Sequence, residues 1–83
     1  MNIEVYGRAD CVYCNMAKDL LNKKGLQYTE HVVGSTITRE AFLTKFPGVR
    51  TVPQITIDGQ LVGGYDKLTE WMKNYDHSKF LAG

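Results

Sequence analysis

The sequence predicts a single α/β domain in which three helices cover a four-stranded mixed sheet. Three observations lead to this prediction. A short apolar segment, residues 2–6, precedes an amphipathic segment that opens with Cys11-Val12-Tyr13-Cys14, and C-x-x-C at the start of a helix that follows a strand is typical of redox proteins. The dipeptide Asp58-Gly59 lies between two short apolar segments, which indicates a β-hairpin. From about residue 65 onward, apolar residues return with the period of a helix.

The first half of the chain is expected to form a strand–helix–strand unit. Residues 2–6 form the first strand, which Gly7 ends. The helix that follows runs to about Gly25, a residue type that often comes just after a helix. Residues 26–33 are rich in side chains that favour strands and form the second strand. Two strands joined by such a crossover are expected to be parallel. The buried stripe of the helix consists of Tyr13, Met16, Ala17, Leu20 and Leu21.

The second half is expected to add a helix, a hairpin and a final helix. After a turn at residues 34–36, a helix spans residues 37–46 and stops before Pro47-Gly48. Strands 54–57 and 60–62 pair antiparallel around the hairpin turn. The final helix begins at Tyr65 or Asp66, and residues 76–83 have no apolar period and are expected to fray or to form a loose last turn. The predicted order is β-α-β-α-β-β-α in one domain over residues 1–83, with its core in residues 2–75.

Composition excludes several classes of function. The formal net charge of the 83 residues is +1, so no broad charged field indicates binding to nucleic acid or to a membrane surface. The first residues lack the basic start and apolar stretch of a secretory signal, and no segment has transmembrane length. Two cysteines in a small chain of this kind indicate a reducing compartment. We therefore expect a cytoplasmic protein with no membrane or nucleic-acid partner.

The two cysteines are interpreted as a catalytic pair. Free N–H groups at a helix start favour a thiolate, so Cys11 is the expected nucleophile and Cys14, one turn further, the resolving thiol. A structural disulfide is one alternative, but closing so short a loop stabilises a fold by only about 2 kcal/mol. Half of a zinc site is another, but such a site needs four ligands, and neither His31 nor His77 has the spacing of a zinc finger. We expect no metal and no catalytic histidine.

Two further segments are candidates for the site. Thr51-Val52-Pro53 precedes the hairpin, where a proline is otherwise simply a residue at the start of a strand. Gly63-Gly64-Tyr65-Asp66 leads into the final helix, where two glycines allow a close approach of backbone and free N–H groups attract an anion. A tight turn in which Asp66 caps the helix is the alternative there.

Together, the C-x-x-C segment, the Thr-Val-Pro segment and the Gly-Gly-Tyr-Asp segment resemble the glutaredoxins, in particular the short dithiol members from bacteria and phages. The resemblance covers roughly residues 2 to 75. It implies the thioredoxin-like fold, glutathione-dependent thiol–disulfide exchange, and a cis peptide bond at Pro53. It also implies glutathione as reductant and co-substrate, and protein disulfides and glutathione mixed disulfides as substrates.

The resemblance also implies where glutathione binds. Arg8 would hold the glycine carboxylate, since a guanidinium suits a carboxylate. The γ-glutamyl end would lie on the amides of Gly64, Tyr65 and Asp66, with the Asp66 side chain near the ammonium group. Tyr13 would border the sulfur, and Thr51 and Val52 would contact the cysteinyl part. Pro53 would face the cysteines and leave the Val52 backbone free to pair with the bound peptide. A second basic residue often helps to bind the glycine carboxylate in the family, and Arg39 and Arg50 are both candidates.

One departure from the family pattern bears on the alternatives. Val12 stands where the commonest glutaredoxin motif has proline, which puts the redox potential in doubt rather than the reaction. A redoxin fed by thioredoxin reductase also uses C-V-x-C, but such proteins lack the Gly-Gly-x-Asp segment. A glutaredoxin that binds an iron–sulfur cluster is disfavoured by Tyr13 and Cys14. We expect a monomer, and the resemblance suggests a ribonucleotide reductase as one client.

Overall fold

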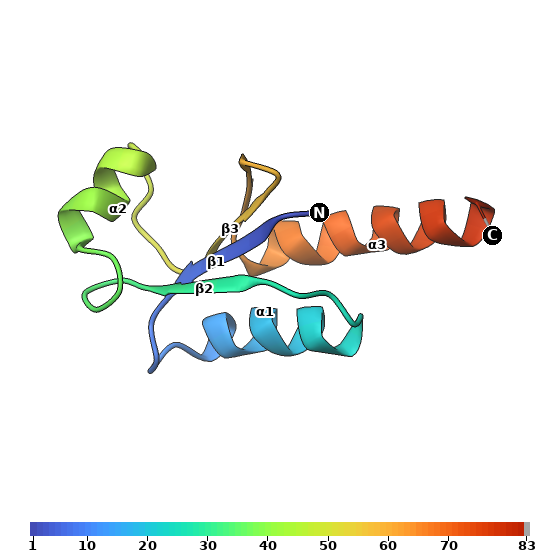
Figure 1. The fold of residues 1–83 in the computed structure, drawn as a ribbon, viewed down its shortest axis with the longest axis horizontal. Coiled ribbons are helices and arrows are strands. Elements are labelled where there is room, and N and C mark those ends of the chain that lie inside the picture. The colour runs from blue at the N-terminus through green and yellow to red at the C-terminus, as the bar shows by residue number, and fades with distance from the viewer. Residues whose placement is uncertain (83) are drawn as a thin grey trace.

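A computed structural model describes residues 1–82 of the chain and the side chains of residues 1–76. Its elements follow the predicted order and confirm a four-stranded mixed sheet with three helices (Figure 1). The elements are β1 (Ile3–Gly7), α1 (Val12–Lys23), β2 (Thr29–Val32), α2 (Arg39–Lys45), β3 (Gln54–Ile57), β4 (Gln60–Gly63) and α3 (Tyr65–Ala82).

The sheet has the strand order β2-β1-β3-β4. As predicted for the strand–helix–strand unit, β1 and β2 are parallel, with Glu4 opposite Thr29. β3 is antiparallel to β1 and to β4. At the hairpin turn Asp58 and Gly59 both have positive φ, 51° and 82°, the combination that a two-residue type I′ turn requires. The turn confirms the sequence signal.

Apolar side chains cover both faces of the sheet. On one face α1 and α3 pack against alternate residues of β1 and β3, because successive strand residues point to opposite sides. The buried residues of this larger core are Ile3, Val5, Ala17, Leu21, Ile55, Ile57, Leu68 and Met72. On the other face Tyr6 packs against Phe42 of α2 and against Phe46, the residue directly after this helix. In Figure 1, α2 accordingly lies apart from α1 and α3, beyond the other side of the strands.

Several element ends differ from the prediction by one residue, and three places differ by more. β2 begins at Thr29 rather than residue 26, because its register on β1 begins at Glu4 and leaves little of β1 for the preceding residues to pair with. α2 begins at Arg39 rather than residue 37, because Ile37 bridges to Val33 and the Thr38 side chain caps the helix by accepting the Ala41 N–H at 3.0 Å.

The third difference is the C-terminal tail. α3 continues to Ala82, so the backbone is helical over most of the segment for which the missing apolar period predicted fraying or a loose last turn. No glycine or proline stands between Tyr65 and Ala82, so no local signal ends the helix where its apolar period fades. Gly25 does act as predicted: it has a φ of +70° directly after the C-cap of α1. Within the described residues no helix has the length and apolar character needed to cross a membrane.

Candidate active site

Cys11 is the N-cap residue of α1. Its backbone is extended, with φ −103° and ψ 118°, and its Sγ accepts the N–H of Cys14 at 3.1 Å. The sulfur therefore lies at the helix start, where unpaired N–H groups and the helix dipole favour negative charge. Cys11 is partly exposed and is a free thiol. This placement agrees with the predicted role of the nucleophile.

Cys14 lies one turn further and is buried, with 1% of its surface exposed. Burial, followed by a hydrogen bond with the Cys11 thiol, raises the pKa of Cys14 to about 11. Gly7 makes room for this side chain: a Cβ at residue 7 would lie 2.7 Å from the Cys14 Sγ. Cys14 thus stays protonated at neutral pH beside the partly exposed Cys11.

The loop before β3 brings backbone to the nucleophile. The Val52–Pro53 peptide bond is cis, as the resemblance implied, and the Val52 carbonyl oxygen lies 3.8 Å from the Cys11 Sγ, within reach of a weak S–H donor. Gln54, itself buried, donates from its side-chain amide to the Thr51 carbonyl oxygen at 3.0 Å. This bond fixes the loop at the edge of the site.

A groove of about 470 Å³ runs beside this loop. Seven residues predicted from the sequence line it, together with Lys67: Tyr13, Thr51, Val52, Pro53, Gly64, Tyr65 and Asp66. They come from α1, the loop before β3 and the start of α3. The rings of Tyr13 and Tyr65 stand 6.1 Å apart at the groove. Three segments that are distant in the sequence thus meet at one cleft.

The start of α3 forms one end of the groove. The Leu68 N–H donates to the Gly64 carbonyl oxygen at 3.0 Å, so the helix begins at Tyr65 and its first N–H groups lack helical partners. Asp66 stands in the first turn and is therefore not the capping residue of the alternative interpretation. Gly63 has a φ of +124°, a conformation that favours glycine.

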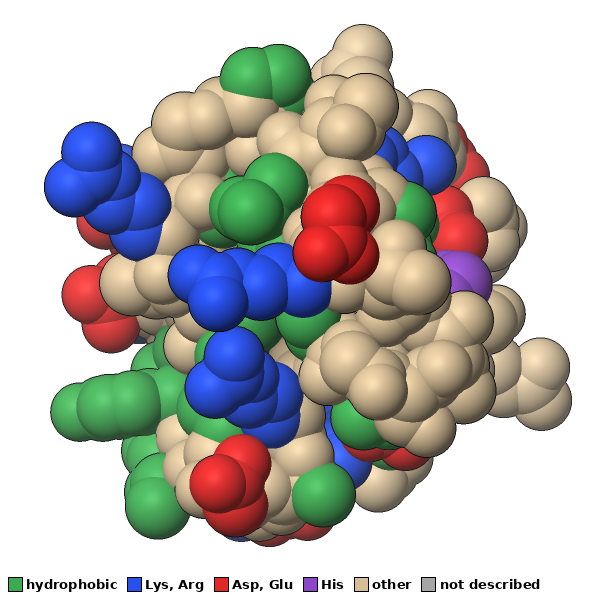
Figure 2. Space-filling view, turned by 90° about the vertical axis from the view of Figure 1, so that its left-hand side faces the viewer, with side chains coloured by type: hydrophobic (Ala, Val, Ile, Leu, Met, Phe, Trp, Pro, Cys, Tyr) green, Lys and Arg blue, Asp and Glu red, His purple; other side chains and the backbone are tan. Residues whose placement is uncertain are grey.

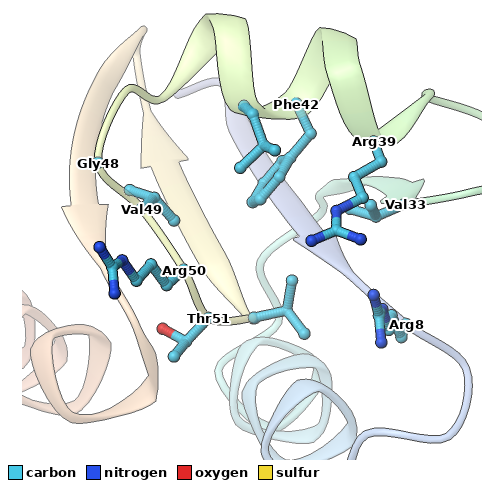
Figure 3. Close-up of a pocket in the computed structure, with 10 residues that line it drawn as sticks. Arg8, Val33, Arg39, Phe42, Gly48, Val49, Arg50 and Thr51 are labelled. Atoms are coloured by element: carbon cyan, nitrogen blue, oxygen red, sulfur yellow. The ribbon is translucent and has the colours of Figure 1, made fainter.

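Arg8 does not line this groove. It lines a second, larger pocket of about 730 Å³, together with Arg39 and Arg50. Thr51 and Val52 line both hollows, so the segment beside Cys11 separates them. Figure 3 shows Arg39, from α2, turned toward the side of the pocket where Arg8 lies, whereas the Arg50 guanidinium turns away at the opposite wall. Of the two candidate partners of Arg8, Arg39 is therefore the one whose side chain turns toward it.

Sequence reasoning missed several residues of the site. Gln54 and Gly7 position the loop and Cys14, and Lys67 lines the groove. A polar residue at the start of an apolar strand is the one signal that pointed to Gln54. Nothing local indicated the packing of Gly7 on Cys14, because the two residues meet only in the fold.

The remaining titratable candidates lie elsewhere. His31 of β2 stacks on Tyr6, with ring centroids 4.4 Å apart, and its Nε2 lies 2.9 Å from a Glu4 carboxylate oxygen. His31 is therefore a residue of β2 with two side-chain partners, and it does not line the groove. Among the side chains that the structure describes, no three His, Cys, Asp or Glu residues gather in a way that could hold a metal ion.

Comparison with known proteins identifies relatives of the chain. The glutaredoxin family profile matches residues 3–62. The chain is 40% identical over 67 residues to glutaredoxin 3 of Escherichia coli, covering 81% of each protein. It is 41% identical over 83 residues to glutaredoxin 1 of Rickettsia felis, covering 98% of this chain and 81% of the relative.

Solved structures agree with these relatives. The structure of reduced E. coli glutaredoxin superposes with a TM-score of 0.74 at 37% identity, over 89% of this chain and 95% of that one. A buckwheat glutaredoxin in complex with glutathione superposes with the same TM-score at 28% identity, over 87% of this chain and 68% of that one. The predicted thioredoxin-like fold is thereby confirmed.

Proposed function

The chain belongs to the glutaredoxin family and is a thiol–disulfide oxidoreductase; from this premise we propose that glutathione is its electron donor and that it reduces protein disulfides and glutathione mixed disulfides. The observation that supports this proposal most directly is the groove beside Cys11. Val52 lines this groove and its carbonyl oxygen lies 3.8 Å from the Cys11 thiol at the start of α1. The residues at the start of α3, with their free N–H groups, line the groove as well. These are three features that a cysteine-containing tripeptide with two carboxylates can use together.

In this proposal the γ-glutamyl carboxylate of glutathione binds the N–H groups at Gly64, Tyr65 and Asp66, where the helix dipole favours an anion. The Asp66 carboxylate then lies near the ammonium group. Tyr13 and Pro53 border the cysteinyl part, and the Val52 backbone pairs with the tripeptide as an added strand would. Arg8, across the Thr51–Val52 segment, holds the glycine carboxylate from the neighbouring pocket.

With a glutathione mixed disulfide the reaction needs one thiol. The Cys11 thiolate attacks the glutathione sulfur, a bond forms between these two sulfurs, and the substrate leaves as a thiolate that takes up a proton. The Cys14 N–H already donates to the Cys11 Sγ and stabilises its negative charge before attack. A second glutathione then attacks the bound glutathione sulfur, releasing oxidised glutathione and restoring Cys11.

With a protein disulfide the reaction needs both thiols. Cys11 forms a mixed disulfide with one client sulfur while the other leaves and is protonated. Cys14, deprotonated as it reacts, attacks the Cys11 sulfur, so that a Cys11–Cys14 disulfide forms and the client is fully reduced. Two glutathione molecules restore the dithiol. Burial of Cys14 keeps its thiol from competing with Cys11 for incoming substrate.

The test compares two electron donors on one glutathionylated substrate. We expect rapid turnover with glutathione, NADPH and glutathione reductase, and little with NADPH and thioredoxin reductase. Glutaredoxins have potentials of about −200 to −230 mV, which a glutathione pool at about −220 to −260 mV keeps largely reduced. Rapid turnover with thioredoxin reductase alone would contradict the proposal and favour the redoxin alternative.

The same proposal includes the oligomeric state, the cellular location and the partners of the protein. The protein acts as a monomer in the cytoplasm on glutathione and on disulfide-containing or glutathionylated proteins, with a ribonucleotide reductase as one candidate client. Sedimentation of the reduced protein tests the oligomeric state, and a colourless preparation is expected because no iron–sulfur cluster belongs to this activity.

A further inference from the structure

The pocket on the far side of Thr51 and Val52 carries more positive charge than glutathione can use. Three arginines line it: Arg8, Arg39 and Arg50. In the part of the chain that the structure describes, none of the three guanidinium groups makes an ion pair or a side-chain hydrogen bond. The net charge of the chain is only +1, so this grouping is local and does not follow from a generally basic surface.

The charge lies on an apolar floor. Val33, Phe42, Val49 and Val52 also line the pocket, and Phe42 is buried. Figure 2 looks onto the α2 side of the molecule and shows Lys and Arg side chains gathered in the middle of this face beside hydrophobic ones, with one acidic side chain next to them and others toward the edges. A partner for this pocket therefore combines negative charge with some apolar surface.

Glutathione alone leaves most of the pocket empty. In the proposed binding mode its γ-glutamyl carboxylate lies in the other groove, so the glycine carboxylate is the single anion on this side, and one guanidinium can bind a carboxylate with two parallel bonds. A pocket of about 730 Å³ lies within the range of roughly 300–1,000 Å³ that holds a whole drug-sized ligand. One glycine residue occupies far less.

The direction in which a peptide binds across Val52 determines which of its residues enter the arginine-lined pocket. Glutathione, lying with its γ-glutamyl end at Asp66 and its glycine toward Arg8, runs from the first groove across Val52 into the pocket. A client peptide bound in the same direction, with its cysteine at Cys11, places the residues that follow this cysteine among the arginines. We propose that this pocket selects protein disulfides in which acidic residues directly follow the attacked cysteine.

This inference rests on the proposed function, because the direction of the client is taken from that of glutathione. It adds a substrate class: the client is an acidic protein segment, read by charge on the C-terminal side of its cysteine. No new chemistry is needed. Cys11 attacks one client sulfur, the other client thiol leaves with a proton, and Cys14 completes the reduction as for any protein disulfide.

The test uses three disulfide-linked peptide dimers with amidated ends. The first is built from Gly-Ala-Cys-Glu-Glu, the second from Gly-Ala-Cys-Gln-Gln, and the third from Glu-Glu-Cys-Ala-Gly. Their reduction is followed with glutathione, NADPH and glutathione reductase. An exposed ion pair changes an equilibrium by roughly 1.4- to 5-fold, so we expect kcat/KM for the first peptide to exceed that for the second and third about fivefold. At 1 M salt, where the Debye length is about 3 Å, the preference is expected to fall below twofold.

Variants connect the preference to the pocket. Arg39→Gln and Arg50→Gln are each expected to lower the ratio of kcat/KM between the first and second peptides about twofold, and the double variant is expected to bring the ratio to about one. Lys73→Gln removes the same charge from the exposed surface of α3 and should leave the ratio unchanged. The ratio within one variant is the readout, so a general loss of activity does not affect it.

The possible outcomes separate this inference from the function on which it rests. Turnover of all three peptides at equal kcat/KM leaves the glutathione-dependent activity intact and overturns the inference. A preference that survives in the double variant, or that favours the third peptide, also overturns it. If glutathione, NADPH and glutathione reductase support reduction of none of the peptides and of no glutathione mixed disulfide, the proposed function itself is contradicted. A dimer formed through this pocket, detected by sedimentation and lost in the double variant, would identify a second copy of the chain as the occupant instead.

Discussion

At the scale of single residues, the two thiols of the site differ in exposure. Cys11 is the N-cap residue of α1, whereas Cys14, one helical turn later, belongs to the buried interior. Cys11 stands outside the first turn of α1 and receives an N–H bond, whereas Cys14 is inside it and buried against Gly7. The same helix therefore exposes one sulfur to substrate and withdraws the other. Their roles should be separable by substitution.

Cys11→Ser is expected to abolish exchange with every substrate, because it removes the sulfur that attacks first. Cys14→Ser is expected to retain at least a tenth of the wild-type rate on a glutathione mixed disulfide, since that reaction needs one protein thiol and free glutathione. It should lose reduction of a protein disulfide. The rate of NADPH oxidation, coupled through glutathione reductase, measures the turnover of each variant on each substrate. Equal inactivity of both variants on the mixed disulfide would show that the roles are assigned wrongly.

The buried thiol should also titrate unusually. Because burial raises the pKa of Cys14 to about 11, its neutral form is favoured in the fold and the thiolate appears only as the pH approaches 11. Cys11→Ser removes the contribution of the Cys11 thiol but keeps the burial, which is the largest cause of the raised pKa of Cys14. Alkylation of Cys14 by iodoacetamide in this variant should therefore still quicken with pH above about pH 9. In the denatured variant the rise should level off above about pH 9, as for an ordinary thiol with a pKa near 8.5. A plateau near pH 9 in the folded variant would contradict the assigned shift.

At the scale of elements, the groove exists because three segment ends converge: the start of α1, the loop before β3 and the start of α3. Each end leaves backbone groups unpaired, and a ligand can pair with them. The side chains of the groove then determine which ligand binds to these backbone groups. Asp66 of α3 is the clearest case, because its charge serves the ammonium group of the ligand in the proposed binding mode.

Asp66→Asn is expected to raise KM for a glutathionylated substrate about tenfold with a smaller change in kcat, because one charge-assisted hydrogen bond contributes roughly 1.5–3 kcal/mol. Asp19→Asn removes the same charge from the exposed surface of α1, outside the groove, and should leave KM within twofold. Steady-state kinetics on both variants decides the point. Parallel changes in the two would indicate a general charge effect rather than a contact of Asp66.

The helix that carries Arg39 depends on its cap. The Thr38 Oγ1 accepts the Ala41 N–H at 3.0 Å, so Thr38→Ala is expected to lower the free energy of unfolding by about 1 kcal/mol, within the range of roughly 0.5–2 kcal/mol for such caps. Thr38→Ser keeps an oxygen in place and should lose less than half as much. Urea unfolding of the three proteins measures the difference. If Thr38→Ala leaves the free energy of unfolding unchanged, the start of α2 is stabilised by the packing of Phe42 and not by the cap.

At the scale of the whole molecule, the sequence was sufficient for the architecture because its strongest signals are local. Asp58-Gly59 predicts a turn, Gly25 ends a helix, and apolar periodicity separates strands from helices. The ends that were predicted wrongly depend on contacts between segments. β2 starts where β1 offers a partner, and α2 starts where Ile37 bridges to Val33.

The same distinction holds for the site. The cysteines and the groove residues stand in recognisable segments, and the structure brings them together as expected. The position of Arg8 in a separate pocket beside Arg39 and Arg50 depends on how α2 and the loop before β3 pack, and no local pattern contains that information. The charge of the second pocket is accordingly a property of the fold.

The long final helix allows a test of where the domain ends. In Figure 1 the C-terminal part of α3 projects beyond the rest of the chain. Among the side chains that the structure describes, the buried core residues of α3 are Leu68 and Met72, in its first half. Deletion of residues 77–83 is therefore expected to lower the free energy of unfolding by less than about 1 kcal/mol. This corresponds to a decrease in Tm of no more than roughly 4–8 °C for a domain of this size, and kcat/KM should not change.

By contrast, Leu68→Ala in the full chain should lower the free energy of unfolding by about 2–5 kcal/mol, because it opens a cavity in the larger core. Thermal and urea unfolding of both variants provides the comparison, and a deletion as damaging as Leu68→Ala would show that the core extends past residue 76.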